Sequence, residues 1–212
     1  MKAHYMAHYY SSRAVNEFGT RPQGHWDAYK FCRTVKTGTI NGFLHVPKSA
    51  GSIRIDESNV ARARQLFGEF IMRKIKEAGL QSVVAIPVPS KDGLRGAADF
   101  RSYSMLRECL AQYPNITVFP GLRYRTAMGS ASKGGPRSRL LLDANTVVAA
   151  AIPEGSILLV DDIVTTGNSM ASAFHSLRKS GRQPACAVSC GYTILTKEDC
   201  EKPCFGDFER EL

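Results

Sequence analysis

The pattern of apolar and polar positions along the chain predicts regularly alternating helices and strands after residue 55. Apolar side chains recur every three or four positions between residues 60 and 75, which predicts an amphipathic helix that begins behind Asp56–Ser58 and stops at Gly79. Four short apolar runs predict buried strands: Ser82–Val88, Ile116–Phe119, Ser156–Asp162 and Ala185–Tyr192. The other predicted helices are Asp99–Gln112, a short helix around Leu140–Ala151, and Ser169–Lys179. This alternation favours an α/β fold with a mostly parallel, twisted sheet and helices on both faces.

The regular pattern covers only part of the chain and suggests three regions. Residues 1–55 are predicted as a small N-terminal extension or hood, because residues 1–52 mix aromatic and turn-forming positions and indicate only short strands and loops. Residues 56–195 are predicted as the main domain, and residues 196–212 as an acidic C-terminal tail. Within the main domain, residues 121–136 hold four glycines among basic residues and serines, which predicts a long mobile loop.

The composition is that of a globular protein. The 212 residues are 43% hydrophobic and 22% charged, which suits one large domain or a domain with a small appendage. No apolar stretch reaches about 18 residues, and the first residues lack the apolar run of a signal peptide. We therefore expect a cytoplasmic protein without a membrane span.

The six cysteines fit a compartment in which thiols stay reduced. Four of them form two C-x3-C pairs, Cys186 with Cys190 and Cys200 with Cys204, for which a zinc site is one interpretation. The first pair falls in a predicted strand, where residues four positions apart are separated by about 13 Å. Buried thiols that act as small hydrophobic side chains are therefore the favoured interpretation.

Positive charge is concentrated in one part of the chain. The formal net charge is +9, and residues 91–142 alone carry +6, whereas residues 197–212 carry −3. A local excess of positive charge indicates an anionic partner, either a phosphate-rich small molecule or a nucleic acid. A solvated basic surface without a partner stays open as the alternative, because no dense run of Lys and Arg is present.

The most informative segment is Ile157–Met170, which places two carboxylates and a polar turn after the strongest predicted strand. Asp161 and Asp162 stand at the carboxyl end of that strand, where parallel sheets bind ligands. Thr165, Thr166, Gly167, Asn168 and Ser169 then form a turn that opens a helix, and its backbone N–H groups predict a phosphate site. Carboxylates beside a phosphate must hold something else, such as sugar hydroxyls or a hydrated Mg²⁺. Together these features predict a site for a ribose 5-phosphate.

Two other interpretations account for this segment less completely. Turn formation and helix capping explain each residue separately, but not the whole set. A receiver-type phosphorylation domain also gathers acidic residues at strand ends, but it would have its acid pair near the first strand and would lack the Thr-Thr-Gly-x-Ser turn.

The same fourteen residues resemble the phosphoribosyl diphosphate (PRPP) signature of the type I phosphoribosyltransferases. The resemblance implies the type I phosphoribosyltransferase fold for the main domain. It also implies that Asp161 and Asp162 contact the ribose hydroxyls and the Mg²⁺, and that Thr165 to Ser169 hold the 5-phosphate. The loop after the strand Ser82–Val88 occupies the place of the family's pyrophosphate loop, so that Ser90, Lys91 and Arg95 become candidate diphosphate ligands.

The glycine-rich basic loop stands where the family keeps a flexible segment that closes over PRPP. By that resemblance, Lys133 and Arg137 are candidate catalytic residues that neutralise the departing pyrophosphate. Residues 83–192 further resemble the ComF competence branch of this family, through these shared positions: Val88-Pro89, Arg95-Gly96, Arg123, Arg125-Thr126, Arg139 and Asn145. The four-cysteine ribbon often found in that branch is absent, and Ala97-Ala98 replaces its usual Phe-Asn.

The resemblance implies a Mg²⁺-dependent enzyme that transfers phosphoribosyl from PRPP to a nitrogen acceptor, such as a nucleobase, and releases pyrophosphate. Trp26 and Tyr192 are the aromatic candidates for stacking on such a base. Family behaviour also leads us to expect a homodimer. Two alternatives stay open: a regulator that binds PRPP or a nucleotide without turnover, and a ComF-like accessory protein that acts with single-stranded DNA.

Overall fold

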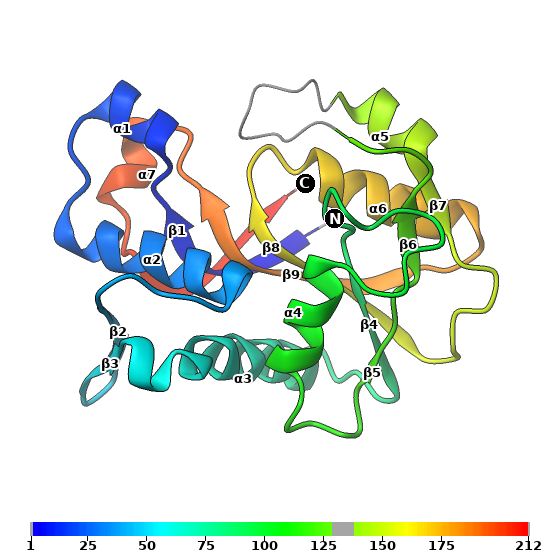
Figure 1. Ribbon diagram of the computed structural model, residues 1–212, viewed down its shortest axis with the longest axis horizontal. Helices are drawn as coiled ribbons and strands as arrows, with labels where there is room; N and C mark the ends of the chain where they lie inside the picture. The colour runs from blue at the N-terminus through cyan, green and yellow to red at the C-terminus, as the bar shows by residue number, and fades with distance from the viewer. Residues whose placement is uncertain (1, 129–137, 212) are drawn as a thin grey trace.

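The computed structural model, which describes residues 2–128 and 138–211, is an α/β fold built on one six-stranded sheet (Figure 1). The strands of that sheet are β1 (Lys2–Tyr9), β4 (Val83–Pro87), β5 (Thr117–Val118), β8 (Ser156–Val164), β9 (Pro184–Thr193) and β10 (Phe205–Glu211). Two antiparallel ribbons stand apart from it: β2 (Leu44–Lys48) with β3 (Gly51–Ile55), and β6 (Leu122–Tyr124) with β7 (Thr146–Val148). The helices of the described residues are α1 (Ser12–Phe18), α2 (Gln23–Thr37), α3 (Ala61–Glu77), α4 (Arg101–Cys109), α5 (Arg139–Asn145), α6 (Asn168–Lys179), α7 (Lys197–Glu201) and a 3₁₀ turn at Glu57–Asn59.

The strand order is β10-β1-β9-β8-β4-β5, and every neighbouring pair is parallel except β10 with β1. The predicted mostly parallel sheet is therefore confirmed. Because β1, β9, β8, β4 and β5 run in the same direction, their carboxyl ends share one edge of the sheet. The loops after β4 and β8 consequently begin side by side at that edge.

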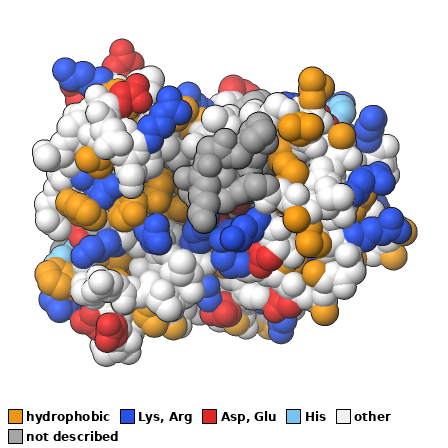
Figure 2. Space-filling model, turned by 45° about the horizontal axis from the view of Figure 1, so that its top comes forward, with side chains coloured by type: hydrophobic (Ala, Val, Ile, Leu, Met, Phe, Trp, Pro, Cys, Tyr) orange, Lys and Arg blue, Asp and Glu red, His pale blue; other side chains and the backbone are white. Residues whose placement is uncertain are grey.

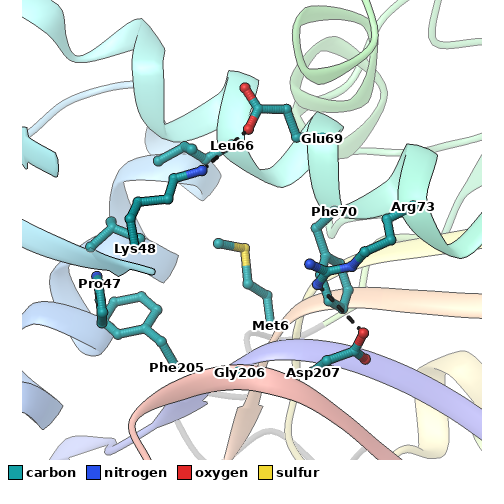
Figure 3. Close-up of a pocket in the computed structure, with 11 residues that line it drawn as sticks. Met6, Pro47, Lys48, Leu66, Glu69, Phe70, Arg73, Phe205, Gly206 and Asp207 are labelled. Carbon is teal, nitrogen blue, oxygen red and sulfur yellow. Dashed lines mark ion pairs between the residues drawn. The ribbon is translucent and has the colours of Figure 1, made fainter. Parts of the chain in front are cut away.

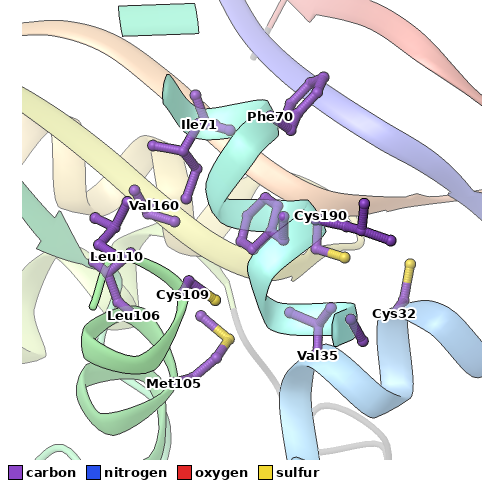
Figure 4. Close-up of a cluster of buried hydrophobic side chains, with 14 of the residues drawn as sticks. Cys32, Val35, Phe70, Ile71, Met105, Leu106, Cys109, Leu110, Val160 and Cys190 are labelled. Carbon is purple, nitrogen blue, oxygen red and sulfur yellow. The ribbon is translucent and has the colours of Figure 1, made fainter. Parts of the chain in front are cut away.

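Two packed layers cover the sheet, as the alternation of side chains along a parallel strand requires. In β4, Val83 and Ala85 pack under α2, α3 and α4, whereas Val84 and Ile86 pack on the side of α6 and the β6–β7 ribbon. Figure 4 shows the first layer, where side chains from α2, α3 and α4 meet those of β8 and β9. The predicted helices on both faces are confirmed.

Residues 1–52 are more regular than the prediction of short strands and loops, which is wrong here. α2 is a helix of 15 residues, and β1 is an interior strand of the main sheet between β9 and β10. The predicted mobile loop likewise contains β6, which pairs with β7. The sheet also crosses both predicted domain boundaries, because β1 lies in the predicted extension and β10 in the predicted tail.

Four of the six cysteines are buried like small hydrophobic side chains, whereas Cys200 and Cys204 are only partly buried. All six are free thiols, and Cys186 and Cys190 are buried in the core, as predicted. Burial raises the pKa of both thiols, which keeps them protonated. Within residues 2–128 and 138–211, no cluster of three or more His, Cys, Asp or Glu side chains has the arrangement of a metal site. In the same residues, no helix combines the length and the apolar character needed to cross a membrane.

Candidate functional site

The two predicted carboxylates lie at the carboxyl end of β8, but they have different surroundings. Asp162 is buried with 4% of its surface exposed, whereas Asp161 is only partly buried. Asp161 Oδ1 accepts a hydrogen bond of 2.8 Å from the backbone N–H of Asp162, and Asp162 Oδ1 accepts one of 2.6 Å from the N–H of Ile163. Backbone donors therefore hold one oxygen of each carboxylate in place.

The second oxygen of Asp162 is held by two cations from distant parts of the chain. The Lys36 ammonium, in the last turn of α2, lies 2.9 Å from Oδ2 of Asp162. Nη2 of Arg101, the first residue of α4, lies 3.3 Å from the same oxygen. A buried carboxylate without partners costs several kcal/mol, so this pairing makes the burial of Asp162 tolerable. Figure 2 shows Lys and Arg side chains gathered near the centre of this face of the molecule.

Asp162 occupies only part of the hydrogen-bonding capacity of the Arg101 guanidinium. Its Nε–H is buried and has no hydrogen-bond acceptor in the part of the chain that the structure describes. Buried donors are almost always satisfied in proteins, so this one stands out at a candidate site.

The two carboxylates also differ in their electrostatics. Burial, together with the negative charge of Asp162, raises the pKa of Asp161 from its usual 3.8 to about 7. Lys36 and Arg101 act in the opposite direction on Asp161 but do not cancel the effect. A dication or a set of sugar hydroxyls at Asp161 would stabilise its charged form.

The turn after β8 leads through a left-handed glycine into the first turn of α6. Gly167 adopts φ +83° and ψ −10°, in the left-handed region, and is the N-cap of α6. Thr165 and Thr166 are exposed, while Asn168 and Ser169 form the partly buried first turn of α6, a helix of 12 residues. The positive end of the α6 helix dipole lies here, a few residues from the acid pair. The five predicted turn residues are thus brought together beside the carboxylates.

The loop after β4 is fixed to the start of α4 by a compact set of hydrogen bonds. The hydroxyl of Ser90 donates to Asp92 Oδ1 at 2.6 Å, and Asp92 Oδ2 accepts from the backbone N–H of Arg101 at 2.8 Å. The backbone N–H of Ser90 donates to Ser102 Oγ, whose hydroxyl donates to Val88 O at 2.7 Å. Ser90, a predicted ligand, is buried and serves to hold this loop beside Arg101.

The remaining predicted diphosphate ligands fall into two groups. Lys91 and Arg95 are exposed on the loop after β4, which starts beside the acid pair because β4 pairs with β8. Lys133 and Arg137 lie outside the described residues, so the structure gives no position for them.

Several other residues of the ComF-like pattern hold backbone in place. Arg123 donates to the carbonyl oxygens of Pro120, Leu122 and Ala97. The side chain of Asn145 accepts from the N–H of Thr126 at 2.9 Å and donates to its carbonyl oxygen at 2.9 Å. These contacts join the β6–β7 ribbon to the loop after β4.

Of the two aromatic candidates for the acceptor, only Trp26 is accessible. Tyr192 is 4% exposed and packs against Tyr5 with ring centroids 5.3 Å apart, so its assignment as a stacking residue is wrong. Trp26 on α2 is 43% exposed, and the guanidinium of Arg21 covers one side of its ring at 4.1 Å.

A cavity of about 320 Å³ lies elsewhere, between β1, β2, α3 and β10 (Figure 3). Its floor is apolar, with Met6, Phe70 and Phe205, and ion pairs such as Arg73 with Asp207 lie at its rim. None of the predicted site residues lines it. The acid pair and the turn therefore define an open site at the sheet edge, separate from this cavity.

Sequence reasoning missed Lys36 and the ion-pairing role of Arg101. Lys36 lies in a segment predicted to be irregular, and Arg101 lies in the basic region 91–142 and in the predicted helix Asp99–Gln112 without an assigned role. No motif links either residue to Asp162, and the pairing arises from the packing of α2 and α4 against the sheet.

The chain matches no family model, and a search of curated proteins found no relative. Its function must accordingly be argued from the site. The site offers carboxylates suited to hydroxyls or a hard cation, a helix start suited to a phosphate, and two cations beside the carboxylate of Asp162.

Proposed function

We propose that this chain is a Mg²⁺-dependent phosphoribosyltransferase of type I fold. It would transfer 5-phosphoribosyl from PRPP to a nitrogen acceptor, such as a nucleobase, and release pyrophosphate. The observation that carries the proposal is the juxtaposition, at the carboxyl end of β8, of the acid pair with the glycine-containing turn that opens α6. The anchored loop after β4, on the neighbouring strand, supports it.

In this proposal the chain acts mainly by positioning its substrates. The N–H groups of the turn at Gly167 would bind the 5-phosphate, and the carboxylate of Asp161 would accept hydrogen bonds from the ribose hydroxyls. Lys91 and Arg95 would approach the diphosphate from the loop after β4. A fixed sugar and a neutralised leaving group are what a displacement at the anomeric carbon requires.

The donor set fits Mg²⁺. Mg²⁺ is usually bound through one or two carboxylates together with substrate phosphates and water, and Asp161 is a partly buried carboxylate with one oxygen held by a backbone N–H. Asp162 Oδ2 is paired with Lys36 and Arg101 and would become available to the ion once they release it. When bound, the ion would supply charge neutralisation on the diphosphate.

A PRPP-binding regulator without turnover is the second candidate. It is favoured by the state of Asp162, whose carboxylate is already engaged by two cations and a backbone N–H. Such a site would bind a ligand by exchange of ion pairs and need not perform a reaction.

The test is pyrophosphate release from PRPP with Mg²⁺, alone and with each member of a panel of nucleobases. The Asp161→Asn/Asp162→Asn double variant is compared with the wild type, and Glu154→Gln serves as the control because Glu154 pairs with Arg182 on the surface. PRPP binding is measured in parallel by calorimetry.

Release that depends on one base and disappears in the double variant supports the transferase and identifies the acceptor. PRPP binding that is lost in the double variant, without release by the wild type, supports the regulator. Unchanged PRPP affinity in a folded double variant contradicts the site assignment for both.

A further inference from the structure

The ion cluster around Asp162 contains more positive charge than this carboxylate alone requires. Lys36 and Arg101 come from different helices and both approach Oδ2 of Asp162, at 2.9 and 3.3 Å. The side chain of Lys36 is 30% exposed and that of Arg101 is 38% exposed, so each side chain is partly open to solvent while its charged group contacts the buried carboxylate. An anion that arrives from solvent therefore has access to them.

The unsatisfied Nε–H of Arg101 indicates what kind of anion. Together Nε and Nη2 form one edge of the guanidinium fork, the edge that binds two oxygens of a phosphate or carboxylate in parallel. Asp162 occupies only Nη2, and Nε has no acceptor among the described residues. One of the two N–H donors on this edge therefore lacks an acceptor, as expected if a bound ligand supplies it.

The place of α4 in the fold strengthens this interpretation. The backbone N–H of Arg101 donates a hydrogen bond to Asp92, and Ser102 and Ser90 exchange hydrogen bonds between backbone N–H and side-chain oxygen. The loop after β4 and the start of α4 therefore form one rigid unit. Lys91 and Arg95 belong to the same loop. A phosphate near that loop would also lie near the fork of Arg101.

We propose that Lys36 and Arg101 are PRPP-binding residues that exchange Asp162 for the diphosphate of PRPP. The proposal rests on the phosphoribosyltransferase or PRPP-binding function above. On binding, the carboxylate of Asp162 would turn to the ribose hydroxyls and the Mg²⁺, and the Lys36 ammonium and the Arg101 fork would pair with the diphosphate. The N-terminal segment thereby completes a site whose other residues come from β8, α6 and the loop after β4.

The experiment compares three probes, each with Mg²⁺: PRPP, ribose 5-phosphate and inorganic pyrophosphate. Lys36→Met is expected to weaken the binding of PRPP and of pyrophosphate about tenfold to a hundredfold, because a charge-assisted contact to the diphosphate is lost. Its affinity for ribose 5-phosphate is expected to change less than about threefold, because that probe has no diphosphate. Lys36→Arg keeps the charge and should restore most of the PRPP affinity.

The control on the same helix is Lys30→Met, because Lys30 donates to the carbonyl oxygen of Phe43 and does not contact Asp162. It should bind all three probes as the wild type does. Arg101→Lys keeps the charge but removes the fork, and a selective loss of PRPP and pyrophosphate binding is expected. This variant decides the question if Lys36→Met does not fold, which thermal unfolding would reveal.

Two results would overturn the proposal. If Lys36→Met weakens the binding of ribose 5-phosphate as much as that of PRPP, Lys36 only holds Asp162 in place and does not bind the diphosphate. If the wild type and Lys36→Met bind PRPP equally well, neither role exists. A wild type that binds none of the probes would instead refute the proposed function itself, so the two failures are distinguishable.

Discussion

The two sides of Asp162 are built in different ways. On one side, the turn that contains Gly167 follows within a few residues on the same chain segment, between β8 and α6. On the other side, Lys36 and Arg101 arrive from α2 and α4, and only tertiary packing brings them to the carboxylate. The first side needs local chain geometry, whereas the second needs the core under α2, α3 and α4.

This difference separates two kinds of vulnerability. A change in the turn alters the candidate phosphate site while the rest of the fold stays intact. A change in the core under α2 displaces Lys36 and weakens the whole protein, because α2 packs on β1, β2 and β9. The following variants test whether the two sides respond independently.

The largest effect on stability is expected in the core that holds α2, and with it Lys36, against the sheet. Phe31 on α2 is fully buried and packs edge-on against Phe205, with ring centroids 5.6 Å apart. Phe31→Ala leaves a cavity in the core and should lower the free energy of unfolding by about 3 to 5 kcal/mol. Urea denaturation, monitored by circular dichroism, measures this change in the free energy of unfolding.

Phe43→Ala is the matched control, because Phe43 is 43% exposed and lies in the loop after α2. Its cost should stay below about 1 kcal/mol, mainly from the lost contact with the Arg54 guanidinium at 4.2 Å. Equal losses in the two variants would mean that α2 does not belong to the cooperative core.

A smaller effect, on the pH dependence of stability, is expected from Asp161. Among the described residues its carboxylate has no direct ion pair, whereas that of Asp162 has two. Burial beside Asp162 raises the pKa of Asp161 to about 7, so the folded state binds this proton more tightly than the unfolded state. The stability that it contributes is complete below its usual pKa of 3.8 and is lost as the pH rises through about 7.

Between about pH 4 and pH 8, the wild type should therefore lose about 1 to 2 kcal/mol more stability than Asp161→Asn. This figure allows for the partial exposure of Asp161. Asp143 is the control with the opposite sign: burial raises its pKa, but hydrogen bonds from Ser172 and Arg139 lower it more, so the net shift is downward. Asp143→Asn should lose stability relative to the wild type above pH 4. Parallel pH profiles for the wild type and Asp161→Asn would contradict the raised pKa.

The smallest effect on stability, with a specific effect on binding, is expected in the turn. Gly167 and Gly181 both have left-handed backbones, with φ of +83° and +80°, at opposite ends of α6. Alanine at either position should cost about 1 kcal/mol of folding free energy. Only Gly167→Ala should also weaken PRPP binding, by about tenfold or more, because the N–H groups of the turn change direction.

Thermal unfolding and calorimetry with PRPP measure both effects on the same samples. Gly181 has open space around its missing side chain, so its variant isolates the backbone strain. If both variants bind PRPP as the wild type does, the turn is not the phosphate site.

The parts of the fold that the sequence predicted are those with a strong single-element pattern. The apolar runs of β4 and β8 and the helical stripes of α3 and α6 fall within a few residues of their predicted positions. β1 escaped prediction because its buried positions are filled by weakly apolar or polar residues, Ala3, Tyr5, Ala7 and His8, and not by the β-branched residues that mark a buried strand. α2 escaped because His25, Asp27 and Thr34 are buried along with its apolar residues, which weakens the contrast between its faces.

For the candidate site the limit is of the same kind. The acid pair and the turn were predictable because their residues are contiguous. Lys36 was not, because an ion pair between α2 and β8 depends on how helices pack, and no local spacing encodes it. Asn145 was noticed in the sequence pattern, but its role, bonding both backbone groups of Thr126, required the folded chain.

The position of β1 also governs the order of events during synthesis. Its partners are the last two strands to be made, with Ala3 opposite Ala187 and Lys2 opposite Glu211. At roughly 5 to 20 residues per second, the ribosome needs about 10 to 40 s between the first strand and its partners. During that interval the aromatic and apolar side chains of β1 lack the two strands that flank it in the folded sheet, which makes this segment a natural target for chaperones. β1 can therefore take its interior place in the sheet only after β9 and β10 have been made.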